Sequence, residues 1–119
     1  MNRPIKFRVW DKRETKGMST QNMLYDAQLH HLWQDFVDYP GSYVLMQYTG
    51  CHDSSNNEIY EGDIVQYNNG DVIRIGYVGF MAGIFFLNYP DETYDELGYL
   101  LVSNLKVIGN KFEHSELLK

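Results

Sequence analysis

The chain has 119 residues, of which 44% are hydrophobic, and a formal net charge of −6 at pH 7. This length predicts one compact unit with a real core, and the apolar runs are too short to span a bilayer. The N-terminus lacks the apolar stretch of a secretory signal, and the acidic balance disfavours general binding to nucleic acid, because a negative field repels phosphate.

Residues 5–10 alternate strictly between apolar and other side chains, which predicts a half-buried strand with Ile5, Phe7 and Val9 on one face. The polar stretch 11–17 ends in glycine and predicts a turn, and residues 18–25 then supply the second strand of a hairpin.

This first stretch is also the basic part of the chain. Residues 1–17 carry six basic and two acidic side chains, whereas the remainder carries four basic and fourteen acidic ones. Lys and Arg on a strand are typical of a solvated edge that deters pairing with other chains, and contact with nucleic acid is the alternative. That alternative would use Arg3, Lys6, Arg8, Lys12 and Arg13.

The middle of the chain gives mixed signals. Apolar residues recur at helical spacing within 26–39, which favours a short helix over a strand, and Pro40 with Gly41 then ends it. Residues 43–48 are rich in aromatic and branched side chains and predict a strand. A polar loop is expected over residues 49–57.

From residue 59 onward, β signals follow one another closely. Asn69 and Gly70 form the dipeptide preferred in type I′ hairpins, where both central residues need positive φ. Expected strands cover residues 64–67, 72–78, 84–89, 99–102 and 105–108, with turns at 61–63 and 79–83, an acidic loop at 90–96 and a terminal helical turn at 113–118. Such short strands leave unpaired edges unless the sheet closes, so we expect a small closed or partly closed barrel in a mainly β, β-rich fold with little helix.

Three groups of residues invite a chemical interpretation, and each has a simpler one. Cys51, His52 and Asp53 have the letters of a nucleophilic triad, but adjacent side chains project apart instead of converging. His30 and His31 lack the spacing of a metal site. The third group is an acidic cluster without the glycine-bearing pattern of a calcium loop: Asp91, Glu92, Asp95 and Glu96. We therefore expect no catalytic, cofactor-binding or metal-binding residues and no enzymatic activity.

Aromatic residues are the remaining anomaly, because 18 of the 119 residues are Phe, Tyr or Trp, and ten of them are Tyr. A small barrel has few inward positions, so several rings should lie at the surface. Exposed Tyr and Trp favour protein interfaces, since one end of each side chain packs while the other bonds to water. A stacking platform for single-stranded nucleic acid is the alternative, and the acidic balance counts against it.

Three segments of the sequence resemble the YopX family of phage and prophage proteins. The central one runs from LMQYTG at residues 45–50 to EIYEGDIV at residues 58–65, and IKFRVWD at 5–11 and VIGN at 107–110 agree with its two ends. The chain departs from the family pattern at Cys51, His52 and residues 54–57, and over 18–42. In physical terms, Gly62 permits an unusual backbone angle and Asp63 can bond nearby backbone amides, which points to a structural role for the motif.

The resemblance implies a small SH3-like barrel in the C-terminal half, residues 59–119, with residues 1–58 as an N-terminal β-rich hairpin extension packed on it. It also implies a phage-encoded protein of uncharacterised function that forms homo-oligomers. The leading hypothesis is thus a non-enzymatic cytoplasmic protein that needs no cofactor or membrane and contacts itself and an unknown host or phage protein. A nucleic-acid-binding accessory protein is the alternative.

Overall fold

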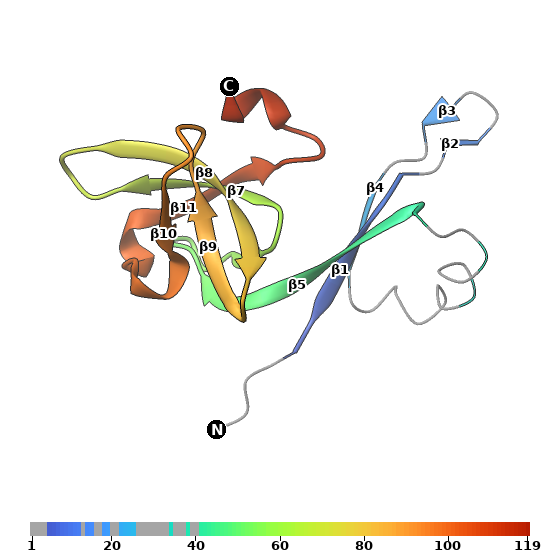
Figure 1. Ribbon diagram of the computed structural model, residues 1–119, viewed down its shortest axis with the longest axis horizontal. Coiled ribbons are helices and arrows are strands. Elements are labelled where there is room, and N and C mark those ends of the chain that lie inside the picture. Colours follow the sequence, from blue (N-terminus) through green and yellow to red (C-terminus); the bar gives the residue numbers. More distant parts are fainter. Residues whose placement is uncertain are drawn as a thin grey trace. The chain divides into compact units, whose positions relative to one another are not determined.

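The computed structural model describes residues 5–12, 14–15, 18–19, 22–25, 34, 38 and 41–119. The chain divides into two compact units, Met1–Gln47 and Tyr48–Lys119. The division predicted from the sequence, between residues 58 and 59, falls at the start of strand β6 (Glu58–Tyr60). Strands dominate the described residues, and no helix among them is long and apolar enough to cross a membrane. The structure is thus mainly β, as predicted (Figure 1).

In the first unit, β1 (Phe7–Asp11) lies between β4 (Asn22–Tyr25) and β5 (Tyr43–His52), antiparallel to both. The predicted strand and its hairpin partner are therefore confirmed. The short strands β2 (Glu14–Thr15) and β3 (Met18–Ser19) pair with each other, so β2 lies where the polar pattern predicted only a turn.

The expectation that β1 is a half-buried edge strand is wrong. It has a partner strand on both sides, and both of its faces carry buried residues: Val9 on one face is 0% exposed, and Arg8 and Trp10 on the other are 3% and 6% exposed. In the sequence, the alternation of apolar and basic residues over 5–10 resembles the pattern of a strand with one face in solvent. The whole side chain of Arg8 is nonetheless buried, so a basic residue in an alternating pattern does not guarantee an exposed strand.

The helix predicted over residues 26–39 lies outside the described residues except at Gln34 and Asp38. Both of these have helical backbone, and the Gln34 side-chain amide donates a 3.0 Å hydrogen bond to Asp38. The strand predicted at 43–48 continues to His52, through part of the predicted loop. Its second half pairs with β6, which supplies the hydrogen-bond partners that keep these polar residues extended.

The second unit is built on a five-stranded antiparallel sheet. Strands β7 to β10 follow one another as a meander, and β11 then returns beside β7, so that the sheet curls (Figure 1). The elements after β6 are β7 (Asp63–Asn68), β8 (Ile73–Met81), β9 (Ile84–Asn88), β10 (Tyr94–Glu96), the 3-10 turns η1 (Leu97–Tyr99) and η2 (Val102–Asn104), β11 (Leu105–Asn110) and the 3-10 turn η3 (Ser115–Leu118). The predicted strands at 64–67, 72–78, 84–89 and 105–108 and the terminal helical turn are confirmed.

Two expectations fail between β9 and β11. The predicted strand at 99–102 is wrong, because backbone bonds from Leu100 to Leu97 and from Asn104 to Leu101 close 3-10 turns there. Tyr99 is 84% exposed, so this apolar run does not enter the sheet. The predicted acidic loop at 90–96 is a short turn followed by the edge strand β10.

The type I′ conformation predicted for the β7–β8 turn occurs instead at the β8–β9 turn. Asn69 and Gly70 do join β7 to β8, but through a four-residue loop in which only Gly70 has positive φ (+95°), so the type I′ prediction is wrong. The Asn69 side-chain oxygen instead accepts the backbone N–H groups of Asp71 and Val72. Positive φ at two successive residues, the type I′ pattern, occurs at Ala82 (+54°) and Gly83 (+80°), between β8 and β9.

The five-stranded sheet has two unlike faces, which we call the core face and the outer face. Successive side chains alternate between them. The core face supplies Val65, Val78, Leu87 and Leu105 to one cluster with Ile59, Tyr89 and Leu97. The register of β8, β9 and β10 places a second apolar set on the outer face: Ile73, Ile75, Tyr77, Met81, Ile84, Phe86 and Tyr94.

Candidate functional site

The turn of the central motif is held by its own polar groups. Gly62 has φ of +85°, where a residue with a Cβ would be strained, and its backbone N–H donates to the Val78 carbonyl at 2.8 Å. The buried carboxylate of Asp63 accepts the backbone N–H of Tyr60 at 2.8 Å. The predicted structural role of these two residues is confirmed, since they fix the bend that leads into β7.

Asp53 is a buried carboxylate with several hydrogen-bond donors around it, and it is 2% exposed. It accepts the backbone N–H groups of Ser55, Asn57 and Val107 and the side-chain amide of Asn57. Burial by itself raises the pKa of this carboxyl, but these donors together hold it below its usual value. Asp53 therefore ties the 53–57 turn to β11.

The other two residues of the triad-like run point to different partners. One ring nitrogen of His52, Nδ1, lies 3.2 Å from the Tyr48 hydroxyl. Cys51 is half-buried and packs against the core cluster. Each of the three side chains thus serves a different local contact. Among the described residues, no group of three or more His, Cys, Asp or Glu side chains is placed to hold a metal ion.

The basic residues predicted for nucleic-acid contact do not share one environment. Arg3 and Arg13 lie outside the described residues, as do His30 and His31. Arg8 is buried, Lys6 is half-buried, and Lys12 is exposed.

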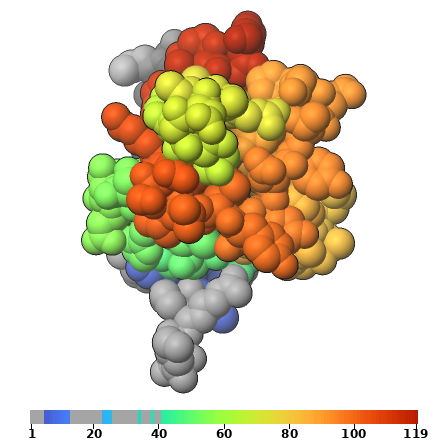
Figure 2. Space-filling view, turned by 90° about the vertical axis from the view of Figure 1, so that its left-hand side faces the viewer, coloured from blue at the N-terminus to red at the C-terminus, as the bar shows by residue number. Residues whose placement is uncertain are grey.

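An open groove at one end of the core face brings together polar and aromatic side chains that the sequence did not connect. It has a volume of about 580 Å³. Its walls come from the β7–β8 hairpin, the turn before β10, β10 and the 97–104 segment, which meet on the side of the molecule that Figure 2 shows. We call it the Arg74 groove, and it is lined by Tyr67, Asn69, Val72, Arg74, Asp91, Thr93, Asp95 and Leu100.

Arg74 is the organising residue of this groove. Its guanidinium carbon lies 3.5 Å from the centroid of the Tyr89 ring, and its Nη2 donates to Asp91 at 3.1 Å and to the Thr93 hydroxyl. The Thr93 hydroxyl and N–H, with Arg74, lower the pKa of Asp91. The stacked and bonded guanidinium is therefore held in one orientation.

Tyr89 forms the buried floor beneath Arg74. Its hydroxyl donates to Asp95 at 2.6 Å. Burial, together with the nearby Asp95 carboxylate, raises the pKa of Tyr89 well above its ordinary value, so this hydroxyl stays protonated at neutral pH. The acidic cluster that the sequence indicated is thus divided: Asp91 and Asp95 bond to groove residues, whereas Glu92 lies exposed in the turn.

Sequence reasoning missed this groove because its members are far apart in the chain. Arg74 alternates with isoleucines on β8, and nothing local links it to Tyr89 or Asp91. Several rings lie at the surface, as predicted, but on different elements: Tyr25, Phe80, Tyr94 and Tyr99 are exposed. On the outer face, Tyr94 is 61% exposed and packs edge-to-face on Phe86 with ring centroids 5.2 Å apart.

The comparisons with known proteins agree with this architecture. Protein EF1440 from Enterococcus faecalis has a similar crystal structure, with a TM-score of 0.59, 25% identity, and coverage of 99% of this chain and 100% of that one. The X-ray structure of YopX from Bacillus subtilis has a similar fold, with a TM-score of 0.57, 17% identity, and coverage of 96% and 98%. No curated protein matches the chain. The family model described as YopX protein matches residues 6–119, and the chain therefore belongs to the YopX family.

Proposed function

We propose that this chain is a non-enzymatic protein of phage or prophage origin that acts in the bacterial cytoplasm through protein contacts, including contacts with its own copies. The outer face of the five-stranded sheet is the observation that supports this most. Exposed apolar side chains that share one face of a sheet are typical of interaction sites.

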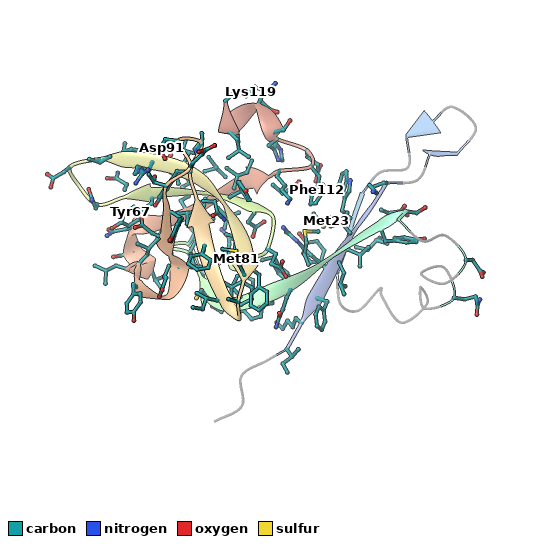
Figure 3. All side chains as sticks on the ribbon, in the orientation of Figure 1. Met23, Tyr67, Met81, Asp91, Phe112 and Lys119 are labelled. Atoms are coloured by element: carbon teal, nitrogen blue, oxygen red, sulfur yellow. The ribbon has the colours of Figure 1, made fainter. Side chains whose placement is uncertain are left out.

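The exposure of the outer face is not confined to one side chain. Met81 is 66% exposed, Ile73 62% and Ile84 40%, and Tyr94 extends the row onto the edge strand. Met81 lies at the β8–β9 turn, at the opposite end of the sheet from Tyr67 and Asp91 (Figure 3). Phe86, Ile75 and Tyr77 between them are half-buried.

A second copy of the chain is the occupant that this face fits most simply. A two-fold axis places the same patch on both sides of an interface, so an apolar face meets an apolar face without any complementary charge. The C-terminal tail covers only part of the row: Lys111 Nζ lies 5.4 Å from the centroid of the Tyr77 ring. Burial of the remaining exposed apolar side chains by a partner would then provide the driving force.

We further propose that the second unit is an SH3-like barrel. The return of β11 to the edge of β7 supports this, because it brings the end of the meander back to its beginning. The 3-10 turns η1 and η2, just before β11, provide the change of direction.

Sedimentation velocity at micromolar concentration tests the proposal. The wild-type chain should sediment as a homo-oligomer, and the double variant Met81→Lys with Tyr94→Lys should weaken the assembly by more than roughly tenfold. Tyr99→Lys, a charge placed at an exposed ring outside the sheet, is the matched control and should leave assembly unchanged. A wild-type monomer, or equal disruption by the control, would contradict the proposal.

Binding of nucleic acid through Arg3, Lys6, Arg8, Lys12 and Arg13 is the competing hypothesis. The burial of Arg8 removes one of its five cations from the surface. A labelled single-stranded DNA at 50 mM salt distinguishes the two: salt-dependent binding that Lys12→Ala weakens would support the alternative.

A further inference from the structure

The Arg74 groove offers more hydrogen-bond donors than its own structure uses. Only Nη2 of Arg74 bonds within the described residues, to Asp91 and Thr93, which leaves the N–H groups on Nε and Nη1 without a described protein acceptor. The hydroxyl of Tyr67 likewise has no described partner. Because Tyr89 and Asp91 hold the guanidinium in place, these donors are already oriented before a ligand arrives.

The remaining walls of the groove combine apolar surface with negative charge. Tyr67, Val72 and Leu100 contribute apolar side chains. The carboxylates of Asp91 and Asp95 line the same groove, and Glu92 is exposed in the adjoining turn. The second unit as a whole carries four basic and eleven acidic side chains, so its field attracts cations.

We infer that the Arg74 groove binds an extended, proline-containing segment of a partner protein that carries a Lys or Arg. Polyproline II backbone has carbonyl acceptors but no N–H groups at its prolines, which suits a groove that offers N–H and O–H donors between aromatic and apolar walls. The basic side chain of the segment would meet the carboxylates around Asp91 and Asp95. This inference rests on the proposed role in protein contacts and adds the chemistry of the partner.

The shape and charge of the groove favour this ligand over others. The groove is open along the surface, whereas small molecules are usually enclosed in pockets that bury most of their surface. Two lining carboxylates would repel the phosphates of a nucleic acid. An extended peptide needs only a groove, and its ordering cost is reduced because proline already fixes φ.

Fluorescence anisotropy with the full chain tests the inference. The probe is a labelled peptide of eight prolines with a lysine at each end. One control replaces both lysines with glutamate, and the other replaces the prolines with a Gly/Ser repeat. The lysine–proline peptide should bind at least about tenfold more tightly than either control, in line with the loss of charge complementarity or of preorganisation.

Variants then locate the binding. Arg74→Met should weaken binding by roughly tenfold and Tyr67→Phe by about fivefold, because each removes donors while keeping most of the packing. The matched controls are Lys106→Met, an exposed cation outside the groove, and Tyr99→Phe, and both should bind like wild type. Thermal melts of every variant distinguish lost contacts from lost folding. Amide shifts in the labelled chain should centre on residues 67, 74, 93 and 95.

The outcomes separate this inference from the proposed function. Absence of binding at millimolar peptide, equal binding of the control peptides, or amide shifts centred on the outer face would overturn it. Sedimentation of the same samples reports self-association independently, since the double variant Met81→Lys with Tyr94→Lys changes the outer face alone. If the chain self-associates but does not bind the peptide, the peptide-binding role of the Arg74 groove is wrong and the proposed self-association stands.

Discussion

The core face and the outer face of the five-stranded sheet are made of the same kinds of residue but have different surroundings. Val78 and Leu87 on the core face are 1% and 0% exposed, whereas Met81 and Ile84, on the same two strands, are 66% and 40% exposed. Apolar side chains on both faces of a strand are typical of a strand that is covered on both sides. The chain itself covers the centre of the core face, whereas these side chains of the outer face stay exposed, and the difference supports a partner for the outer face.

The largest effect on the free energy of unfolding should come from shortening a side chain on the core face. Leu87→Ala removes a fully buried side chain from the cluster, and the free energy of unfolding should fall by about 2–5 kcal/mol. Met81→Ala, made on the outer face of the neighbouring strand, should change it by no more than about 0.5 kcal/mol in the monomer. Urea denaturation at low protein concentration measures both. Similar losses from the two variants would mean that the outer face is buried within the monomer.

Two glycines on β8 give a second comparison of the faces. A Cβ on Gly76 would lie 2.4 Å from the backbone carbonyl oxygen of Asn88, which cannot move without shifting β9. Gly76→Ala should therefore lower the free energy of unfolding by about 2 kcal/mol. A Cβ on Gly79 would meet only the side-chain amide of Asn88, at 2.7 Å, and this group can rotate away. Gly79→Ala should cost less than about 1 kcal/mol, as thermal unfolding would show.

A third comparison sets a buried carboxylate against an exposed one. In the folded protein, both carboxylate oxygens of Asp53 accept hydrogen bonds, and Asp53→Asn keeps only one acceptor oxygen. The free energy of unfolding should therefore fall by about 2 kcal/mol at pH 7. Because the pKa of Asp53 is depressed in the folded state, its ionised form stabilises the fold above the ordinary value of 3.8, and this stability is lost as the pH falls through the folded pKa.

The wild-type chain should thus lose stability as the pH falls below 3.8, and Asp53→Asn should flatten that decline. Asp91→Asn is the control. The pKa of Asp91 is lowered too, but its carboxylate is exposed and its ion pair with Arg74 lies at the surface, so the variant should have the smaller effect. If Asp91→Asn flattens the profile more than Asp53→Asn, Asp53 does not hold the turn to β11.

The smallest effect concerns the turn that joins β8 to β9. Ala82 has φ of +54°, which asparagine tolerates better than other residues with a Cβ. Ala82→Asn should raise the free energy of unfolding by about 0.5 kcal/mol, and Ala82→Val should lower it by about 1 kcal/mol. Calorimetric melting temperatures would show the opposite signs. A gain from valine would mean that the turn has another conformation.

Much of the fold could be predicted because strands and tight turns have short-range sequence patterns. Alternation over 5–10 and 72–78 and the branched residues of 64–67 gave strands that the structure contains. The predictions failed where pairing with a distant segment determines the local backbone conformation. Residues 49–52 stay extended because β6 pairs with them, whereas the apolar run at 99–102 pairs with no described strand and closes into 3-10 turns.

The same distinction between local and distant contacts applies to the candidate sites. The Gly62–Asp63 bend could be predicted, because its hydrogen bond joins residues three apart. The bond from Val107 to Asp53 spans 54 residues, and the ion pair of Arg74 with Asp91 spans 17, so no local pattern could reveal either of them. The burial of Arg8 was hidden for a related reason, since charge alone does not report what covers a strand.

By itself, then, the sequence determined the strands at 64–67, 72–78, 84–89 and 105–108, the bend at Gly62 and Asp63, and the resemblance to YopX. Only the tertiary structure decided which face of each strand is covered, and that Arg74, Tyr89 and Asp95 meet at one groove. The physical reason is that strand formation and tight turns depend on neighbours a few residues away. Burial and the convergence of side chains depend instead on the register with which distant strands pair.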